Sequence, residues 1–136
     1  MKQFLSSGGL YQQTGLTLIR IILGLLLAYH GWEVFDSAKM QEYANWDIFK
    51  KTSAPSIMVY LGKGSEFVAG VLLILGLLTR FACLITIGTM LYIAFFVGNG
   101  KIWYEDQHPF LFVLLALVFF FNGAGKWSLD ARLFNR

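Results

Sequence analysis

Residues 15–35 read GLTLIRIILGLLLAYHGWEVF, and the single charge in the apolar run from Leu16 to Tyr29 is Arg20. A helix needs about 20 mostly apolar residues to cross the hydrocarbon core of a bilayer. Three more stretches have this character, and the sequence predicts four membrane spans, at about residues 15–35, 56–78, 81–98 and 107–124. The continuous apolar run of the fourth, residues 109–121, is shorter than a full crossing, so either flanking residues extend it or the helix is short and the bilayer thins.

The composition agrees with a protein surrounded by lipid. Of 136 residues, 57% are hydrophobic and 14% are charged, whereas soluble domains carry about 25% charged residues. The predicted fold class is all-α: an integral membrane antiparallel four-helix bundle, in a single domain over residues 1–136, with helices crossing at about 20°. Between the first two spans, Met40, Tyr43 and Trp46 interleave with Lys39 and Glu42, which predicts one short interfacial helix within residues 36–55.

The distribution of basic residues predicts the topology. Four spans place both termini on one side of the membrane, and the basic residues on that side are Lys2, Arg20, Arg80, Lys126, Arg132 and Arg136. The opposite side has Lys39, Lys50, Lys51 and Lys101. The excess of positive charge predicts that both termini are cytoplasmic. No long basic run is present, so nucleic acid is not an expected partner.

Some polar residues lie at membrane depth and should find partners there, because an ionisable group in the bilayer centre costs roughly 2.5–3.5 kcal/mol. Arg20 shares a helix face with Gly24 and Gly31, and Glu66 lies between Gly62 and Gly70. Glycines on these faces predict a close approach of the first two helices. We therefore expect Arg20 and Glu66 to form an ion pair within the bundle.

A second group of polar residues is expected near the opposite surface: His30, Glu33, Lys63, Glu105, Asp106 and His108. Together they could rim a pocket, although solvated helix ends are the preferred explanation of Glu33, Glu105 and Asp106, and His30 is equally explained as a packing residue. The candidate ligand or cleft residues are Arg20, His30, Lys63, Glu66 and His108. No set of metal ligands is recognised, and catalytic residues are unknown. Cys83, the single cysteine, excludes an internal disulfide and is expected to be buried and inert.

The C-terminal segment is expected to turn back against the bundle. Gly123 and Gly125 permit the turn, Ser128 is a candidate cap of a short helix, and Asp130 would lie in the first turn of that helix. The interaction of Asp130 with the helix dipole is a sufficient explanation for this residue.

Three segments in order resemble the DoxX family of small bacterial membrane proteins, which includes the DoxD-type small subunit of thiosulfate:quinone oxidoreductase. The segments are Arg20-Ile21-Ile22-Leu23-Gly24 with His30-Gly31, then Glu66-x-x-x-Gly70 with Gly76-x-x-Thr79-Arg80, then Gly123-x-Gly125-x-x-Ser128-Leu129-Asp130. The resemblance extends from about Thr17 to Asp130. It departs after His30-Gly31, where the family often has a lysine and this chain has Glu33-Val34-Phe35. The resemblance implies a multi-pass protein of the bacterial inner membrane, near quinone- or thiol-linked redox chemistry and often in a complex; it supplies no catalytic residue.

Three functions remain in competition. The first is a membrane subunit of a redox complex that binds quinone in a polar cleft between the first two spans, with Arg20, His30 and Glu66 as the groups that bind quinone oxygen or handle its proton. The second is a non-enzymatic scaffold or anchor, and the third is a small transporter or proton pathway. A haem held by His30 and His108 is a weaker alternative. Besides lipid, the expected partners are a redox subunit or a second copy of the chain.

Overall fold

The computed structural model describes residues 4–135, and within that range every regular element is helical. The elements are α1 (Gln12–Gly31), a 3-10 turn η1 (Trp32–Phe35), α2 (Ser37–Ala44), α3 (Asp47–Lys50), α4 (Pro55–Leu75), α5 (Thr79–Tyr92), a π-helical segment η2 (Ile93–Val97), α6 (Gln107–Asn122) and α7 (Leu129–Phe134).

Three helical segments are long and apolar enough to cross a membrane: Gln12–Phe35, Pro55–Leu75 and Thr79–Val97. They match the first three predicted spans to within a few residues. The fourth apolar helix, α6, has 16 residues and is therefore about 24 Å long, less than the roughly 30 Å of a typical hydrocarbon core. Of the two possibilities that the sequence left open for this span, the structure shows the short helix.

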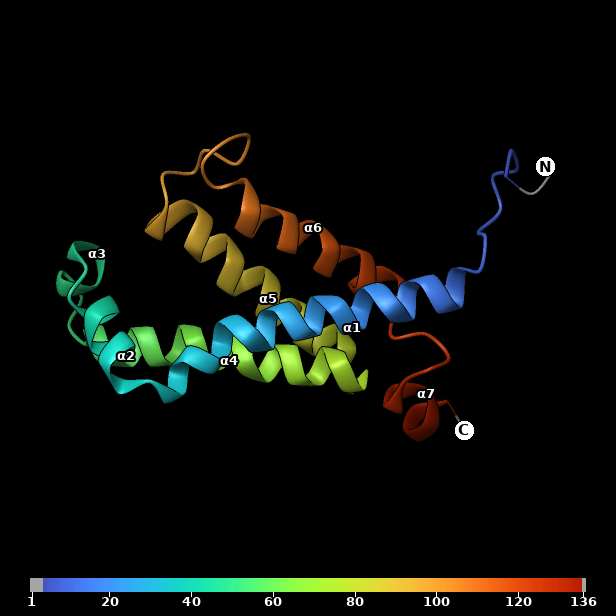
Figure 1. Cartoon of the computed structure of the whole chain (residues 1–136), viewed down its shortest axis with the longest axis horizontal. Helices are drawn as coiled ribbons and strands as arrows, with labels where there is room; N and C mark the ends of the chain where they lie inside the picture. Colours follow the sequence, from blue (N-terminus) through green and yellow to red (C-terminus); the bar gives the residue numbers. More distant parts are fainter. Residues whose placement is uncertain (1–3, 136) are drawn as a thin grey trace.

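Successive long helices run in alternating directions (Figure 1). Helix α1 packs most extensively on α4, and α5 packs on both α4 and α6. We call the end at which α1 begins and α7 lies the tail end, and the opposite end, which holds α2 and α3, the far end (Figure 1).

Glycines bring α1 and α4 together as the sequence predicts. A Cβ atom on Gly24 would lie 2.7 Å from the carbonyl oxygen of Gly70, and one on Gly31 would lie 2.6 Å from the Cα of Phe67. A Cβ on Gly70 would collide with the backbone nitrogen of Ala28. Side chains larger than hydrogen at these positions would force the helices apart.

The buried apolar core joins all four long helices, and large apolar side chains also cover the outside. The core comprises Leu23, Leu27, Ala69, Leu73, Ala82, Cys83, Met90, Phe112, Val113, Ala116 and Phe119. Exposed apolar residues on the same helices include Leu18, Ile22, Leu25, Val68, Leu84, Leu111 and Leu114. Helices that are apolar all round are expected where lipid replaces water as the solvent.

The segment between α1 and α4 contains a short helix, α2, as the sequence predicts, and a second one, α3, that the sequence did not indicate. The Asp36 carboxylate caps α2 by accepting hydrogen bonds from the backbone of Ala38 and Lys39. Asn45 closes α2 through its side chain, which donates to the Gln41 carbonyl at 2.9 Å, and Trp46 then adopts an extended backbone that redirects the chain into α3. The pair is anchored on α4 by a small core of Met40, Phe49 and Val59.

Candidate functional site

An ionic cluster lies at the far end, around Lys63 of α4. The Nζ atom of Lys63 is 3.1 Å from Oε2 of Glu33 and 3.3 Å from Oε2 of Glu66, which follows it on the same helix by three residues. Nζ also donates to the His30 carbonyl at 3.4 Å. Glu66 is only 4% exposed, so Lys63 is the charge that compensates a carboxylate removed from solvent.

The short helices complete this cluster. Tyr43 of α2 donates its hydroxyl hydrogen to Oε2 of Glu33 at 2.8 Å, and its ring lies 5.5 Å from the Lys63 ammonium. Burial and then the Glu33 hydrogen bond raise the pKa of Tyr43 to about 12. Lys39 donates to Oε1 of Glu33 at 2.9 Å, and this hydrogen bond raises the pKa of Lys39. Glu33 is thus held by three donors from two helices, Lys39 and Tyr43 of α2 and Lys63 of α4.

A cavity of about 230 Å³ lies beside the cluster. Lys63 and Glu66 supply its charged groups, while its walls are largely apolar and aromatic; they include Trp46, Phe49, Met58, Val59, Tyr92, Ile93 and Val97. Small-molecule sites commonly combine apolar walls with a few polar groups in this way. We call this space the far cavity.

One wall of the far cavity has unusual backbone geometry. At Ile93 the α-helix α5 becomes the π-helical segment η2, and Ile93 and Val97 both line the cavity. The Gly98 backbone nitrogen donates to the Ile93 carbonyl, five residues back, at 2.7 Å. Single π-helical turns within α-helices are rare and are frequent at functional sites.

The predicted ion pair between Arg20 and Glu66 is wrong. Side chains on a helix point back toward its N-terminus, and α1 and α4 run in opposite directions (Figure 1). Arg20 therefore extends toward the tail end, where its Nη2 donates to the Trp127 carbonyl at 2.7 Å, whereas Glu66 extends toward Lys63 at the far end. The two side chains lie on the same pair of helices but make their contacts at opposite ends of that pair.

The polar cleft expected between the first two spans is also not where the sequence placed it. Glycine contacts close the interface between α1 and α4. The far cavity instead lies on the side of α4 that faces α2, α3, α5 and η2, and no α1 residue lines it. Of the five predicted cleft residues, Lys63 and Glu66 line this cavity.

The two histidines come together outside the cavity. His30 and His108 have ring centroids 6.1 Å apart, and both residues are exposed. Within residues 4–135, no group of three or more His, Cys, Asp or Glu side chains is arranged to hold a metal ion. Asp106 accepts hydrogen bonds from the backbone of Asn99 and Lys101, so it organises the loop between η2 and α6 and does not rim a pocket with Lys63.

One part of each of the three quoted motifs lies at the tail end, where Arg20, Gly76 and Asp130 come together. The Asp130 carboxylate accepts hydrogen bonds from the backbone nitrogens of Leu78 and Thr79 at 2.7 and 2.9 Å, and so caps α5 from another part of the chain. The Asp130 backbone nitrogen donates to the Gly76 carbonyl at 2.9 Å. Asp130 does lie in the first turn of α7, and Ser128 caps that helix as predicted. The interpretation of Asp130 as a dipole partner alone is wrong.

Gly76 is required here for two reasons. Its φ of 64° is the left-handed conformation that ends α4, and a Cβ atom at this position would collide with Nη1 of Arg20. Arg20 is 1% exposed, and Asp130 is the carboxylate that interacts with it electrostatically. Gly123 and Gly125, with φ of 77° and 81°, form the turn that returns the tail, as the sequence predicts.

Sequence reasoning missed the aromatic and hydroxyl residues of the far cavity as site residues. Tyr43, Trp46 and Phe49 come from the segment that was assigned a surface role, and Thr89 and Tyr92 from the uncharged third span. A signal for the last two existed, since they share one face of their helix with three-residue spacing.

The long helices are apolar on their outward surface as well as in the core, which is the character of a helical membrane protein. Within it, Lys63 and Glu66 form a charged pair beside an aromatic cavity. The chain belongs to the DoxX family, because the model of that family matches residues 15–99. It is also similar to an uncharacterized protein of Haemophilus influenzae, with 30% identity over 133 residues that cover 93% of this chain and 96% of the relative. No solved structure matches the chain.

Proposed function

We propose that this protein is the membrane subunit of a quinone- or thiol-linked redox complex, and that the far cavity holds the headgroup of a quinone. The observation that carries the proposal is the buried carboxylate of Glu66, paired with Lys63 at 3.3 Å on the wall of an otherwise apolar cavity. Membership of the DoxX family supports the redox assignment by resemblance.

The residues present fit a quinone headgroup. Aromatic and aliphatic walls suit a flat ring, and the π-helical wall supports a ligand site because such turns are frequent at functional positions. The Lys63 ammonium would donate a hydrogen bond to a quinone oxygen in place of its 3.4 Å contact with the His30 carbonyl, and Glu66 would hold or release a proton beside it. A bound quinone would supply a two-electron, two-proton redox couple, and a partner subunit would exchange the electrons.

A scaffold is the second candidate, and the tail end favours it. Arg20, Gly76 and Asp130 join α1, α4, α5 and α7 through hydrogen bonds and close packing that position the helices. A protein with this network alone would anchor partner subunits without chemistry of its own.

The two candidates are separated by extraction of purified protein with organic solvent. The redox proposal predicts quinone in the wild-type extract and a loss of it in Glu66→Gln, because the variant removes the charge that organises Lys63. Glu42→Gln is the matched control, since Glu42 lies exposed on α2 outside the cavity. Absence of quinone from both the wild type and the control, together with a stable co-purifying partner, would support the scaffold and overturn the redox proposal.

The same proposal includes the topology: four spans in a bacterial inner membrane, with the tail end in the cytoplasm. Arg20, Arg80, Lys126 and Arg132 support this orientation by the positive-inside rule. Green fluorescent protein fused after residue 136 should fluoresce, because it matures in the cytoplasm, and alkaline phosphatase at the same position should be inactive. The opposite result would overturn the orientation.

A further inference from the structure

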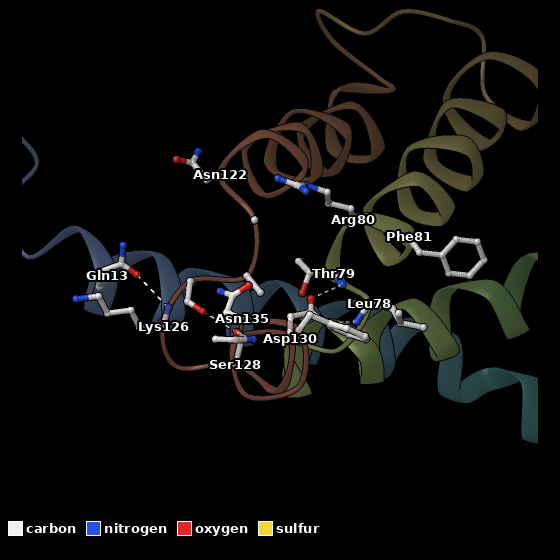
Figure 2. A pocket seen from close by; sticks show the side chains of 15 residues that line it. Gln13, Leu78, Thr79, Arg80, Phe81, Asn122, Lys126, Ser128, Asp130 and Asn135 are labelled. Atoms are coloured by element: carbon white, nitrogen blue, oxygen red, sulfur yellow. Dashed lines mark hydrogen bonds between the residues drawn. The ribbon is translucent and has the colours of Figure 1, made fainter.

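A second hollow lies at the tail end, away from the far cavity. It has a volume of about 730 Å³ and is enclosed by the first turn of α5, the end of α6, the linker 123–126 and α7 (Figure 2). Residues that matter here are Leu78, Arg80, Phe81, Asn122, Lys126 and Phe134. We call this hollow the tail pocket; it is independent of the proposed quinone site.

The tail pocket carries positive charge. Arg80 extends from α5 toward the end of α6 (Figure 2), where its Nε donates to the Phe120 carbonyl at 3.2 Å. Its two terminal nitrogens have no hydrogen-bond partner among residues 4–135, so they remain available as a fork that suits an oxyanion. Lys126 adds a second cation to the lining.

The acidic residue of the lining does not cancel this charge. Asp130 already accepts two backbone hydrogen bonds and faces Arg20, which is almost wholly buried behind it. Nε and Nη1 of Arg20 have no hydrogen-bond partner among the described residues. The guanidinium therefore offsets Asp130, and Arg80 and Lys126 leave the tail pocket attractive to an anion.

The border of the tail pocket is apolar on one side. Leu78, Phe81 and Phe134 line it and are 48%, 58% and 64% exposed. The pocket lies where α4 ends, α5 begins and α6 ends, which is the depth of the lipid headgroups for helices of this kind. Trp127, exposed beside it, is a residue type enriched at that depth.

We propose that the tail pocket binds an anionic phospholipid, with the phosphate at Arg80 and the acyl chains along Leu78, Phe81 and Phe134, while Lys126 adds positive charge on the other side of the pocket. The cations alone would suit any phosphate. The exposed apolar border at membrane depth favours a phosphate that is part of a lipid, because acyl chains can pack on the border whereas a free anion gains no binding energy from it.

The test is native mass spectrometry of the full chain, delipidated in detergent and titrated with phosphatidylglycerol or phosphatidylcholine of the same acyl chains. Phosphatidylglycerol should bind the wild type more tightly. Arg80→Gln and Lys126→Gln should each weaken its binding about fivefold, the effect of roughly one surface cation on anionic lipid, and phosphatidylcholine binding should not change. Arg132→Gln is the matched control, because Arg132 is an exposed cation of α7 outside the lining.

Arg80→Lys separates charge from structure. It keeps the cation but loses the fork, so its phosphatidylglycerol binding should lie between those of the wild type and Arg80→Gln; a loss as large as in Arg80→Gln would show that the charge does not hold the lipid and would overturn the proposal. Equal weakening by Arg132→Gln would also overturn it, since the effect would then be general surface charge. Inorganic phosphate is the third arm: if it displaces phosphatidylglycerol at equal concentration, the occupant is a free anion and the lipid assignment fails.

Discussion

Replacement of Asp130 with alanine tests the network that fixes the tail end. The carboxylate accepts two hydrogen bonds, at 2.7 Å from Leu78 N and 2.9 Å from Thr79 N, and a hydrogen bond to a charged group contributes about 1.5–3 kcal/mol. Leu78 N can recover water as its partner, because its bond is exposed. Thr79 N is less accessible, and Arg20 also loses its nearby carboxylate. We therefore expect a loss of about 3 kcal/mol in the free energy of unfolding, and about half of that for Asp130→Asn, which keeps one acceptor.

The assay is reversible unfolding in mixed micelles by increasing detergent denaturant, followed by circular dichroism, with limited trypsin digestion of the tail. Asp130→Ala should also expose Arg132 to cleavage, because α7 loses its attachment to α5. The matched control is Asp36→Ala, which removes a cap that is local to α2 and should cost about 1 kcal/mol without change in tail digestion. Unfolding of Asp130→Ala within about 0.5 kcal/mol of wild type, with the tail still protected, would refute the capping role.

Three further outcomes are expected. Gly31→Ala should destabilise the protein by about 1–3 kcal/mol, because the new Cβ would press on the backbone of α4. The control Gly88→Ala, in open space on α5, should be neutral or stabilising by up to about 1 kcal/mol. Equal effects of the two substitutions in unfolding assays would contradict the close contact at Gly31. The pKa of Tyr43 is raised to about 12, so the stability that its hydroxyl contributes should be complete below about pH 10 and lost as the pH rises toward 12. The free energy of unfolding of the wild type minus that of Tyr43→Phe, measured across this range, gives this contribution. A difference that stays constant with pH would exclude the predicted loss. The losses of unfolding free energy caused by Arg20→Gln and Glu66→Gln should add within about 0.5 kcal/mol in a double-mutant cycle, because the two side chains make their contacts at opposite ends of the helix pair. A larger coupling energy would indicate that the two side chains do form an ion pair.

Much of the fold follows from the sequence because the membrane leaves few alternatives. Apolar runs fix the helices to within a few residues, and the glycine spacing on α1 and α4 indicates their contact. The turn at Gly123 and Gly125 and the cap at Ser128 are equally local signals. In each case the physical cause acts over a few residues or along one helix face.

Partners between distant segments could not be predicted in the same way. The reasoning that buried charges seek each other was sound for Glu66, but it chose Arg20 by depth and ignored the direction in which side chains leave a helix. Lys63, one turn away on the same helix, was the partner. The contact of Asp130 with Leu78 and Thr79 depends on where the tail lands, which no local pattern contains. The far cavity was missed because its walls come from five separate elements, α2, α3, α4, α5 and η2.

Fluorescence quenching by a short-chain quinone tests most directly whether the far cavity is a quinone site. Quinones quench nearby indole rings, and Trp46 lines the cavity whereas Trp127 lies at the tail end. In variants that retain one tryptophan each, the Trp46 protein should show saturable quenching, and Glu66→Gln should weaken its midpoint about tenfold, the equivalent of one lost charged hydrogen bond. The Trp127 protein should show only the linear, non-saturable quenching of quinone dissolved in detergent. The same linear response from both proteins would contradict the proposed site.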